Sequence, residues 1–332
     1  MKCQRGMHFV SKEVTAFKKA DPTGFALFLV SAPRIWYNEK NGRCRIMSEK
    51  RKKRILRLCL VFLVLLSASI AFLLPRPMNE PQDNTVAVND GHGTIRIEPI
   101  PGLPASTLRR SEFTHRDNAI TYTGMEYTAC QGVDVSDWQN EIRWQEVADS
   151  GIDFAVIRCG YRSYGIGELR PDNCFEVNYD GSGEAGLRRG VYFFSQAVSV
   201  EEAREEAAYV LLLLQGRALE LPVFYDWETV TDPEGRANAV DGSIVTACAA
   251  AFCKAIEEAG YRAGVYFNKQ MGYHTYDLAQ CKDYTLWLAE PGKHPTFYYH
   301  AALWQYDHHG TVPGIDTEAD RNILFEAKKI ET

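Results

Sequence analysis

The sequence predicts an α/β protein whose main domain is an irregular TIM-like (β/α)5(β)3 barrel, preceded by a transmembrane helix and an extended linker. Two observations in residues 129–330 predict the barrel. Short β-type runs alternate with amphipathic helical stretches, and the last three runs follow one another with little helix between them. The candidate strands are 132–135, 154–158, 190–195, 222–226, 262–267, 285–289, 301–306 and 321–325.

Helix boundaries support this alternation. Ser199 and Glu202 form a capping-box pattern before a predicted helix at 203–215, and Gly216 follows as a stop signal. A second helix is predicted at 243–259, ending at Gly260. Helices of this length between strands predict parallel neighbours in the sheet.

The transmembrane helix is predicted from charge and hydropathy. Residues 1–57 hold 15 Lys/Arg against 4 Asp/Glu, and this basic block meets a run without charges from Leu58 to Leu74. A nucleic-acid-binding arm can also be basic, but the direct junction favours membrane topology, so no nucleic-acid partner is expected. We predict a cytoplasmic basic tail at 1–54 and a signal anchor at 55–74 in contact with the lipid bilayer, with the rest extracytoplasmic. Secretion after signal cleavage is the alternative.

The first 46 residues fit a signal anchor poorly, because such anchors usually lie near the start of a chain. Met47 followed by the basic run would make a conventional beginning. We hypothesise that translation starts there and that residues 1–46 are not translated; the alternative is a short disordered cytoplasmic tail. Intact-mass analysis of native protein that detects residues 1–46 would refute the hypothesis.

Residues 75–128 predict an extended linker, because they carry six prolines and little apolar periodicity; only a short strand at 94–97 is suggested. Six of the nine cysteines follow the apolar run, and none forms a CxxC pair. They are interpreted as buried thiols or disulfide staples. No metal or organic cofactor is expected.

Four carboxylates are predicted to meet at one mouth of the barrel. Asp134 lies near the end of the first strand, Asp226 and Glu228 end the fourth strand, and Asp320 opens the last one. In a β/α barrel, functional residues gather at the carboxyl ends of the strands. Asp226 and Glu228 share one strand face, with about 6.5–7 Å between their Cα atoms. Two carboxylates this close repel, so one keeps its proton, which supplies the acid and the base that glycosidic cleavage needs.

Aromatic residues at strand ends are candidates for stacking on sugar rings, although packing in the core explains many of them. Phe194, Phe224 and Phe267 are assigned to the core. The candidate substrate-binding residues are Tyr161, Tyr192, Trp287, Trp304 and Gln305.

Residues 130–326 resemble the catalytic domain of glycoside hydrolase family 25, the lysozymes that cut the β-1,4 bond between N-acetylmuramic acid and N-acetylglucosamine. Order and spacing agree along the domain. The matching stretches are GVDVSDWQNEIRWQEV (132–147), SGIDFAVIRCGYR (150–162), GLRRGVYFFS (186–195), LPVFYDWE (221–228), YRAGVYFN (261–268), LWLAE (286–290), LWQY (303–306) and VPGIDTEADRN (312–322).

The resemblance implies roles for the four acids. Glu228 would be the general acid and later the base. Asp226 would stabilise the oxocarbenium centre, position the substrate acetamido group or act as nucleophile. Asp134 and Asp320 would support binding and the charge balance. Retaining and substrate-assisted mechanisms both stay open. Peptidoglycan glycan strands are the implied partner, and a monomer is expected.

Two departures from the family pattern concern substrate binding. The family often has tyrosine where this chain has Pro291, and Arg321 stands where an apolar residue is usual. The affinity of individual sugar subsites is therefore less certain than the class of bond cleaved.

Three other functions are less consistent with the sequence. A chitinase-like glycosidase also ends a strand in Asp-Trp-Glu, but its two preceding aspartates are replaced here by Phe224 and Leu221. An inactive wall-binding module on the same barrel is disfavoured by the presence of all four acids. A metal site at His308 and His309 is disfavoured because adjacent histidines on a strand point apart; they are assigned to a solvated loop.

Overall fold

The computed structural model describes residues 48–73, 83–116 and 119–328. It divides into two units, residues 1–81 and residues 82–332. In the first, helix α1 spans Glu49–Leu73. The second contains the barrel.

Helix α1 covers most of the predicted transmembrane segment. It begins inside the basic run, so Lys50, Arg57 and the basic residues between them share the helix with the apolar side chains that follow. Among residues 48–73, 83–116 and 119–328, no helix has both the length and the apolar character that a bilayer crossing requires. The predicted transmembrane helix at 55–74 is therefore not supported. The hypothesis about residues 1–46, and residues 75–82 of the predicted linker, lie outside the described residues.

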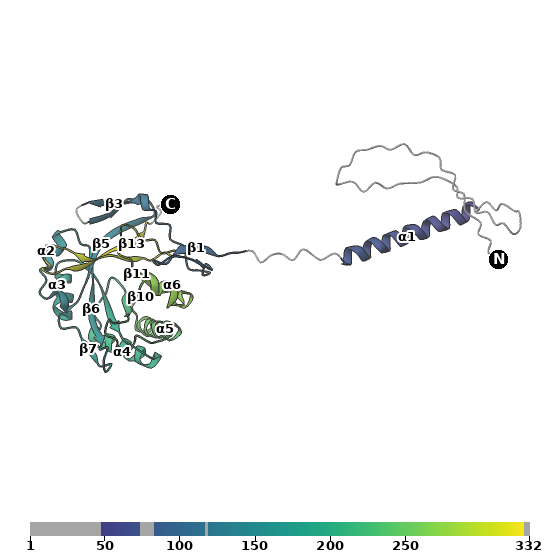
Figure 1. The fold of residues 1–332 in the computed structure, drawn as a ribbon. Coiled ribbons are helices and arrows are strands. Elements are labelled where there is room, and N and C mark those ends of the chain that lie inside the picture. Colours follow the sequence, from purple (N-terminus) through teal and green to yellow (C-terminus); the bar gives the residue numbers. More distant parts are fainter. Residues whose placement is uncertain (1–47, 74–82, 117–118, 329–332) are drawn as a thin grey trace, which may run out of the picture. The chain divides into compact units, whose positions relative to one another are not determined.

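The second unit contains a closed barrel of eight strands (Figure 1). Neighbouring strands are parallel from the first to the seventh, and the eighth pairs antiparallel with both the seventh and the first, which closes the ring. The barrel strands are β5 (Tyr127–Val135), β6 (Phe154–Arg162), β8 (Arg188–Ser195), β9 (Val223–Trp227), β10 (Ala263–Asn268), β11 (Thr285–Ala289), β12 (Leu303–Gly310) and β13 (Ala319–Ala327). A short strand, β7 (Leu169–Pro171), pairs with β6 outside the ring.

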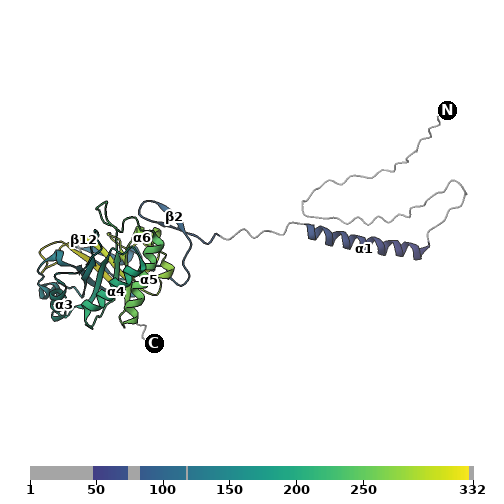
Figure 2. The ribbon, with the colours of Figure 1, turned by 90° about the horizontal axis from the view of Figure 1, so that it is seen from below.

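Helices follow each of the first five barrel strands and none follows the last three, which confirms the predicted (β/α)5(β)3 architecture. The helices are α2 (Trp144–Asp149), α3 (Phe175–Glu184), α4 (Val200–Leu214), α5 (Gly242–Glu258) and α6 (Lys269–His274). In the view from below, α4, α5 and α6 lie over the strands (Figure 2). Ser199 caps α4 by accepting a hydrogen bond from the Glu202 amide, as its sequence pattern predicts.

Alternation along the strands separates two apolar cores. Phe154 and Val156 point inward with Phe224, whereas Ala155 and Ile157 belong to the larger core outside the barrel wall. The free cysteines Cys159, Cys248, Cys253 and Cys281 are buried, so these four are thiols in the core. No disulfide occurs among the described cysteines.

The segment before the barrel is folded, contrary to the predicted extended linker. It forms two antiparallel hairpins, β1 (Val86–Asn89) with β2 (Thr94–Ile97) and β3 (Phe113–Arg116) with β4 (Ala119–Tyr122). Strand β2 coincides with the short strand suggested at 94–97. A 3-10 turn, η1 (Arg110–Glu112), leads into β3.

The β3–β4 hairpin takes the place of the missing helices. It lies on the side of the barrel opposite α4 and α5, beside β5 and β13 (Figure 1). Phe113 makes edge contacts with Trp304 of β12 and Phe325 of β13, at ring-centroid distances of 5.7 and 6.1 Å. Ile120 is buried in the same outer core. The outward faces of the last strands are apolar, and this hairpin removes them from water.

Candidate active site

The site lies at the carboxyl ends of the parallel strands. Asp134 comes from β5, Asp226 from β9 and Gln305 from β12, while Glu228 follows β9 by one residue. Because β13 runs antiparallel, its start reaches the same end, and Asp320 is directly opposite Asp134 in the strand register. The four predicted carboxylates therefore converge.

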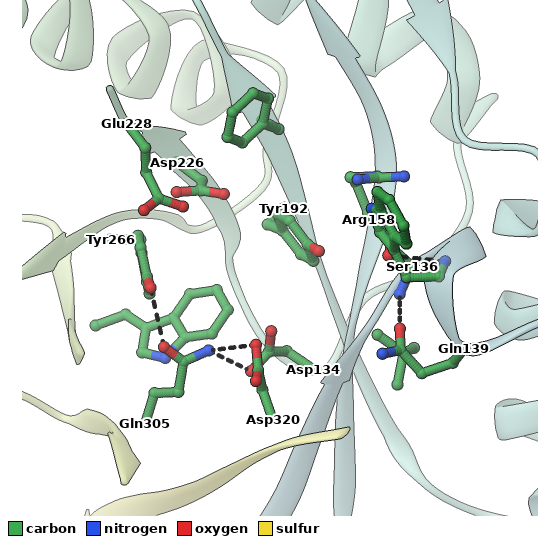
Figure 3. Close-up of a pocket in the computed structure, with 14 residues that line it drawn as sticks. Asp134, Ser136, Gln139, Arg158, Tyr192, Asp226, Glu228, Tyr266, Gln305 and Asp320 are labelled. Carbon is green, nitrogen blue, oxygen red and sulfur yellow. Dashed lines mark hydrogen bonds between the residues drawn. The ribbon is translucent and has the colours of Figure 1, made fainter. Parts of the chain in front are cut away.

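A cavity of about 290 Å3 opens between these strand ends (Figure 3). Its walls combine the four acids with aromatic and amide side chains. The lining residues are Asp134, Val135, Ser136, Trp138, Gln139, Arg158, Tyr192, Phe194, Asp226, Glu228, Tyr266, Trp287, Gln305 and Asp320.

Two hydrogen-bond relays hold Asp134 in place. The Tyr266 hydroxyl donates to Gln305 Oε1 at 2.9 Å, and Gln305 Nε2 donates to Asp134 Oδ2 at 2.8 Å. From the other side, Trp287 Nε1 donates to Asn322 Oδ1 at 2.9 Å, and Asn322 Nδ2 donates to Asp134 Oδ2 at 2.6 Å. Each relay fixes the orientation of an amide, so the polar floor of the cavity is organised before any ligand enters.

Asp134 and Asp320 form one acid pair. Burial, followed by the charge of Asp320, raises the pKa of Asp134 well above its ordinary value. Gln305 Nε2 lies 3.1 Å from Asp320 Oδ2 as well as near Asp134, so one amide bridges both carboxyl groups. Repulsion from Asp320 therefore adds to burial in favouring the neutral form of Asp134.

Asp226 and Glu228 form the second pair, and their carboxyl groups point toward one another (Figure 3). Burial, followed by the charge of Glu228, raises the pKa of Asp226 well above its ordinary value. Burial also raises the pKa of Glu228, while a hydrogen bond with Asp226 opposes that rise. Asp226 is only 5% exposed, whereas Glu228 is partly exposed. The pair therefore holds one proton, between a deep carboxyl and one nearer the surface.

Asp226 has one oxygen free for a ligand. Its Oδ1 is buried and has no hydrogen-bond partner among the described residues. Arg158 is the cation whose charge lowers the pKa of Asp226, but its guanidinium is held by Asp172 at 2.7 Å and by Asp137. An acceptor left without a donor in a cavity is a position where a substrate N–H or a developing positive charge would be stabilised.

Four of the five predicted substrate-binding residues line one of two adjoining cavities. Tyr192, Trp287 and Gln305 line the cavity with the acids. Tyr161 lies in an adjoining cavity of about 380 Å3, which shares Trp138, Arg158 and Phe194 with the first one.

Trp304 does not belong to the site. Its neighbour Gln305 points into the barrel, so Trp304 points outward, where its Nε1 donates to the Glu290 carbonyl oxygen at 2.8 Å. It packs under Phe113 in the outer core. The prediction that Trp304 binds substrate is wrong for this reason.

Several cavity residues were not identified as site residues from the sequence. Phe194 was assigned to the core, but it shares a strand face with Tyr192 and lines both cavities. Trp138, 76% exposed, also lines both. Alternation from Tyr192 is the signal that places Phe194 at the mouth. Trp138 lies in a 3-10 helix, η2 (Asp137–Gln139), which is too short for periodicity to predict the direction of the side chain.

The two histidines are in a strand and not in the predicted loop, because β12 extends through both. His308 Nδ1 lies 3.6 Å from Asp320 Oδ1, and His309 Nδ1 lies 2.7 Å from Glu318. A hydrogen bond with Asp320 raises the pKa of His308, and the charge of His308 in turn lowers the pKa of Glu228. The hydrogen bond with Asp320 therefore favours the charged form of His308 at the edge of the acid cluster.

The sequence matches known proteins over this domain. A family profile described as glycosyl hydrolases family 25 matches residues 133–315. YegX of Escherichia coli strain K12, described as uncharacterized, is 28% identical over 208 residues, which cover 58% of this chain and 68% of that protein. Lysozyme M1 of Streptomyces globisporus is 28% identical over 137 residues, covering 40% of this chain and 42% of the lysozyme.

Solved structures share the fold. The modular autolysin LytC of Streptococcus pneumoniae, in complex with a synthetic peptidoglycan ligand, superposes with a TM-score of 0.54 at 20% identity. That match covers 73% of this chain and 56% of the autolysin, so the chain spans little more than half of its length. A family 25 glycosyl hydrolase of Bacillus anthracis gives a TM-score of 0.51 at 20% identity, covering 64% of this chain and 92% of the hydrolase.

Proposed function

Because this chain belongs to the glycosyl hydrolases family 25, we propose that it hydrolyses the β-1,4 bond between N-acetylmuramic acid and N-acetylglucosamine in peptidoglycan. Its barrel is a glycoside hydrolase domain of the lysozyme type. The observation that carries the proposal is the Asp226–Glu228 pair, which shares a proton at the edge of a cavity lined by aromatic and amide groups. Peptidoglycan as substrate is supported by the names of the similar proteins, among them an autolysin solved with a synthetic peptidoglycan ligand.

Glu228 is the proposed general acid. It is the more exposed carboxyl of the pair, so a glycosidic oxygen entering the cavity reaches it before Asp226. Burial raises its pKa, which favours the protonated form that a general acid needs. After the first bond breaks, the same carboxylate would take a proton from the attacking water.

Asp226 is the proposed stabiliser or nucleophile. Its partnerless Oδ1 can accept the N–H of the substrate acetamido group or face the oxocarbenium-like carbon. Both roles require a charged Asp226 during the reaction, so the proton of the pair must reside on Glu228 once substrate is bound. A glycosidic oxygen placed beside Glu228 would favour that arrangement, because it gives the proton a new acceptor.

Asp134 and Asp320 are proposed to orient the sugar. The two carboxyl groups and the Gln305 amide that bridges them present polar groups at the floor of the cavity. Tyr192 and Tyr266 stay neutral there, because burial raises the pKa of each phenol well above its ordinary value. Neutral phenols and amides suit the hydroxyl groups of a sugar.

The test is Glu228→Gln in the full chain, assayed on insoluble peptidoglycan. We expect release of muropeptides to fall by about 10²–10⁴-fold, the usual contribution of general acid–base assistance. Wall binding and thermal stability should be retained. Glu234→Gln is the matched control, because Glu234 is an exposed acid on the same loop after β9 and lies outside the cavity.

Near-normal release by Glu228→Gln would overturn the assignment. An inactive wall-binding module would sediment with the wall and release nothing even as wild type. Mass spectrometry identifies the bond: a muramidase leaves N-acetylmuramic acid at the new reducing end, whereas a glucosaminidase or a chitinase-like enzyme leaves N-acetylglucosamine.

The cellular location is a separate proposal. Peptidoglycan lies outside the cytoplasmic membrane, so the barrel would have to be exported, and the basic and apolar sequence at 50–74 is the segment with the composition of an export signal. Added protease should then degrade the barrel in intact cells whose wall has been removed. Protection equal to that of a cytoplasmic marker would refute the proposal.

A further inference from the structure

A second cavity lies where the segment before the family domain meets the barrel. Its volume is about 570 Å3, larger than the cavity that holds the four acids. The β3–β4 hairpin supplies one wall, and the end of β12 with the loop after β11 supplies the other. The lining residues are His115, Arg116, Ala119, Ile120, Pro291, Gly292, Tyr306 and Asp307.

This cavity differs from the catalytic one in charge. Arg116 is exposed, and among residues 83–116 and 119–328 no carboxylate lies within ion-pair distance of it. His115 Nε2 donates to the Lys293 carbonyl oxygen at 2.7 Å, which joins the hairpin to the loop after β11. Lys293 itself is exposed. Burial lowers the pKa of neighbouring His294, and the charges of Arg110 and His115 lower it further while the charge of Glu290 opposes them. Basic groups therefore surround one side of the cavity, and Asp307 adds a carboxylate on the other.

The two cavities lie on opposite faces of the same strand. Gln305 points into the barrel and lines the catalytic cavity, whereas Tyr306 points outward and lines the second one. Asp307 also lines the second cavity, and the next residue, His308, is 3.6 Å from Asp320 of the acid cluster. Both cavities are near the carboxyl ends of β11 and β12. Residues that line them are neighbours in the chain, and the wall of the barrel lies between the two cavities.

We propose that this second cavity binds the peptide attached to the N-acetylmuramic acid of the substrate, with Arg116 as the main contact for its carboxylates. The proposal rests on the function proposed above. Wall peptides project from the lactyl group of that sugar and carry carboxylates and an amine. An extended peptide spans roughly 3.3 Å per residue, so a four-residue stem reaches about 13 Å from its sugar.

The mixture of charges favours a peptide over a purely anionic wall polymer. A guanidinium recognises carboxylate and phosphate equally well. Asp307 distinguishes them, because it would repel a polymer of phosphates but attract the amine of a wall peptide. Pro291 also lines the cavity, opposite the hairpin that carries Arg116.

The experiment compares two soluble substrates: glycan chains that carry their peptides, and the same chains after an amidase has removed them. We expect Arg116→Gln to lower kcat/KM about tenfold on the peptide-bearing chains, as loss of one charged hydrogen bond would, and to leave the peptide-free chains unaffected. Arg116→Glu should have a larger effect in the same direction. Arg204→Gln is the control, because Arg204 is an exposed arginine on α4 whose partner is Glu201.

Three results would overturn the proposal. Equal loss on both substrates would mean that Arg116 acts on the fold or on the sugar site. No loss on either would mean that the cavity does not contact substrate. Competition by purified teichoic acid that Arg116→Gln abolishes, without dependence on the peptide, would assign the cavity to a phosphate polymer.

A failure of the proposed hydrolytic function can be distinguished from a failure of the peptide-binding proposal. If wild type cleaves neither substrate, calorimetric titration with a soluble disaccharide-tetrapeptide and with the peptide-free disaccharide still measures the peptide contribution. Tighter binding of the tetrapeptide that is lost in Arg116→Gln supports the proposal without any hydrolysis. Equal affinity of wild type for both ligands contradicts it.

Discussion

Two clusters of buried acids in this barrel differ in what surrounds their charge. Glu206 on α4 is fully buried, but it lies 2.7 Å from Arg162 Nε and accepts a hydrogen bond from the Ser195 hydroxyl at 2.6 Å. Asp226 is also buried, and its partner in the cavity is a second acid, Glu228. In both places burial raises the pKa of the acid, to about 7 for Glu206.

The difference shows how similar burial serves two purposes. Glu206 is tied to a cation and a hydroxyl, so its charge joins α4 to β6. The acids at the barrel mouth are joined to each other, so they retain a proton and an unsatisfied oxygen that a substrate can use. A perturbed pKa alone would not separate these clusters; the partner and the cavity do.

Removing the cation beside Glu206 should have the largest effect on stability. Arg162→Met leaves a buried acid without its partner, and we expect a loss of about 3–5 kcal/mol in the free energy of unfolding at pH 8. The loss should shrink as pH falls through about 7, because the folded protein then protonates Glu206. Urea unfolding at pH 8 and pH 5 measures this. Arg170→Met, at an exposed ion pair, should cost at most about 1 kcal/mol.

Removing an acid from the mouth of the barrel should change the free energy of unfolding in the opposite direction. Asp226→Asn is expected to lower kcat by about 10²–10³-fold through loss of charge stabilisation in the transition state. The same change should raise the free energy of unfolding. The raised pKa of Asp226 means that the wild type loses stability as pH rises above the unfolded pKa, and asparagine avoids that loss. Thermal unfolding measures this. A gain in stability that grows with pH would support the contrast between Asp226 and the ion-paired Glu206, and a loss of stability would contradict it.

The smallest expected effect concerns the cation at the edge of the mouth. His308→Gln removes a charge that lowers the pKa of Glu228, so the alkaline limb of the pH–activity profile should move to higher pH. The shift arises only where His308 is protonated, and Asp320, which raises its pKa, extends that range upward. Asp307 and Glu228 are the other acids acting on this imidazole. His309→Gln is the control, because His309 pairs with exposed Glu318. Identical pH–activity profiles for the wild type, His308→Gln and His309→Gln would show that His308 does not influence the pKa of Glu228.

Sequence reasoning identified the barrel because each strand has a local signature. Runs such as 285–289 are apolar, short and bounded by polar residues, and β11 has the predicted bounds. The four acids were identifiable because strand ends of a β/α barrel meet at one mouth. Alternation could also have excluded Trp304, since adjacent Trp304 and Gln305 cannot both face the cavity.

Except for the short strand at 94–97, the folded segment at 83–116 and 119–126 could not be identified in this way. Its strands have four residues each, too few for periodicity to distinguish them from loop. Leu103, Phe113 and Ile120 are buried only because the outer faces of β12 and β13 lack helices. The outer faces of β12 and β13, which these residues contact, are about 200 residues away along the chain. A local sequence pattern therefore cannot predict the contact.

The sequence by itself determined the order of strands and helices, the family of the domain and the four acids at its mouth, because these depend on local periodicity and spacing. Only the tertiary structure decided that the acids form two pairs, that Glu206 is ion-paired with Arg162 whereas Asp226 faces a second acid, and that the β3–β4 hairpin forms one wall of a second cavity. Those features depend on contacts between side chains that are far apart in the sequence, because such contacts determine which groups are buried and which charges are paired.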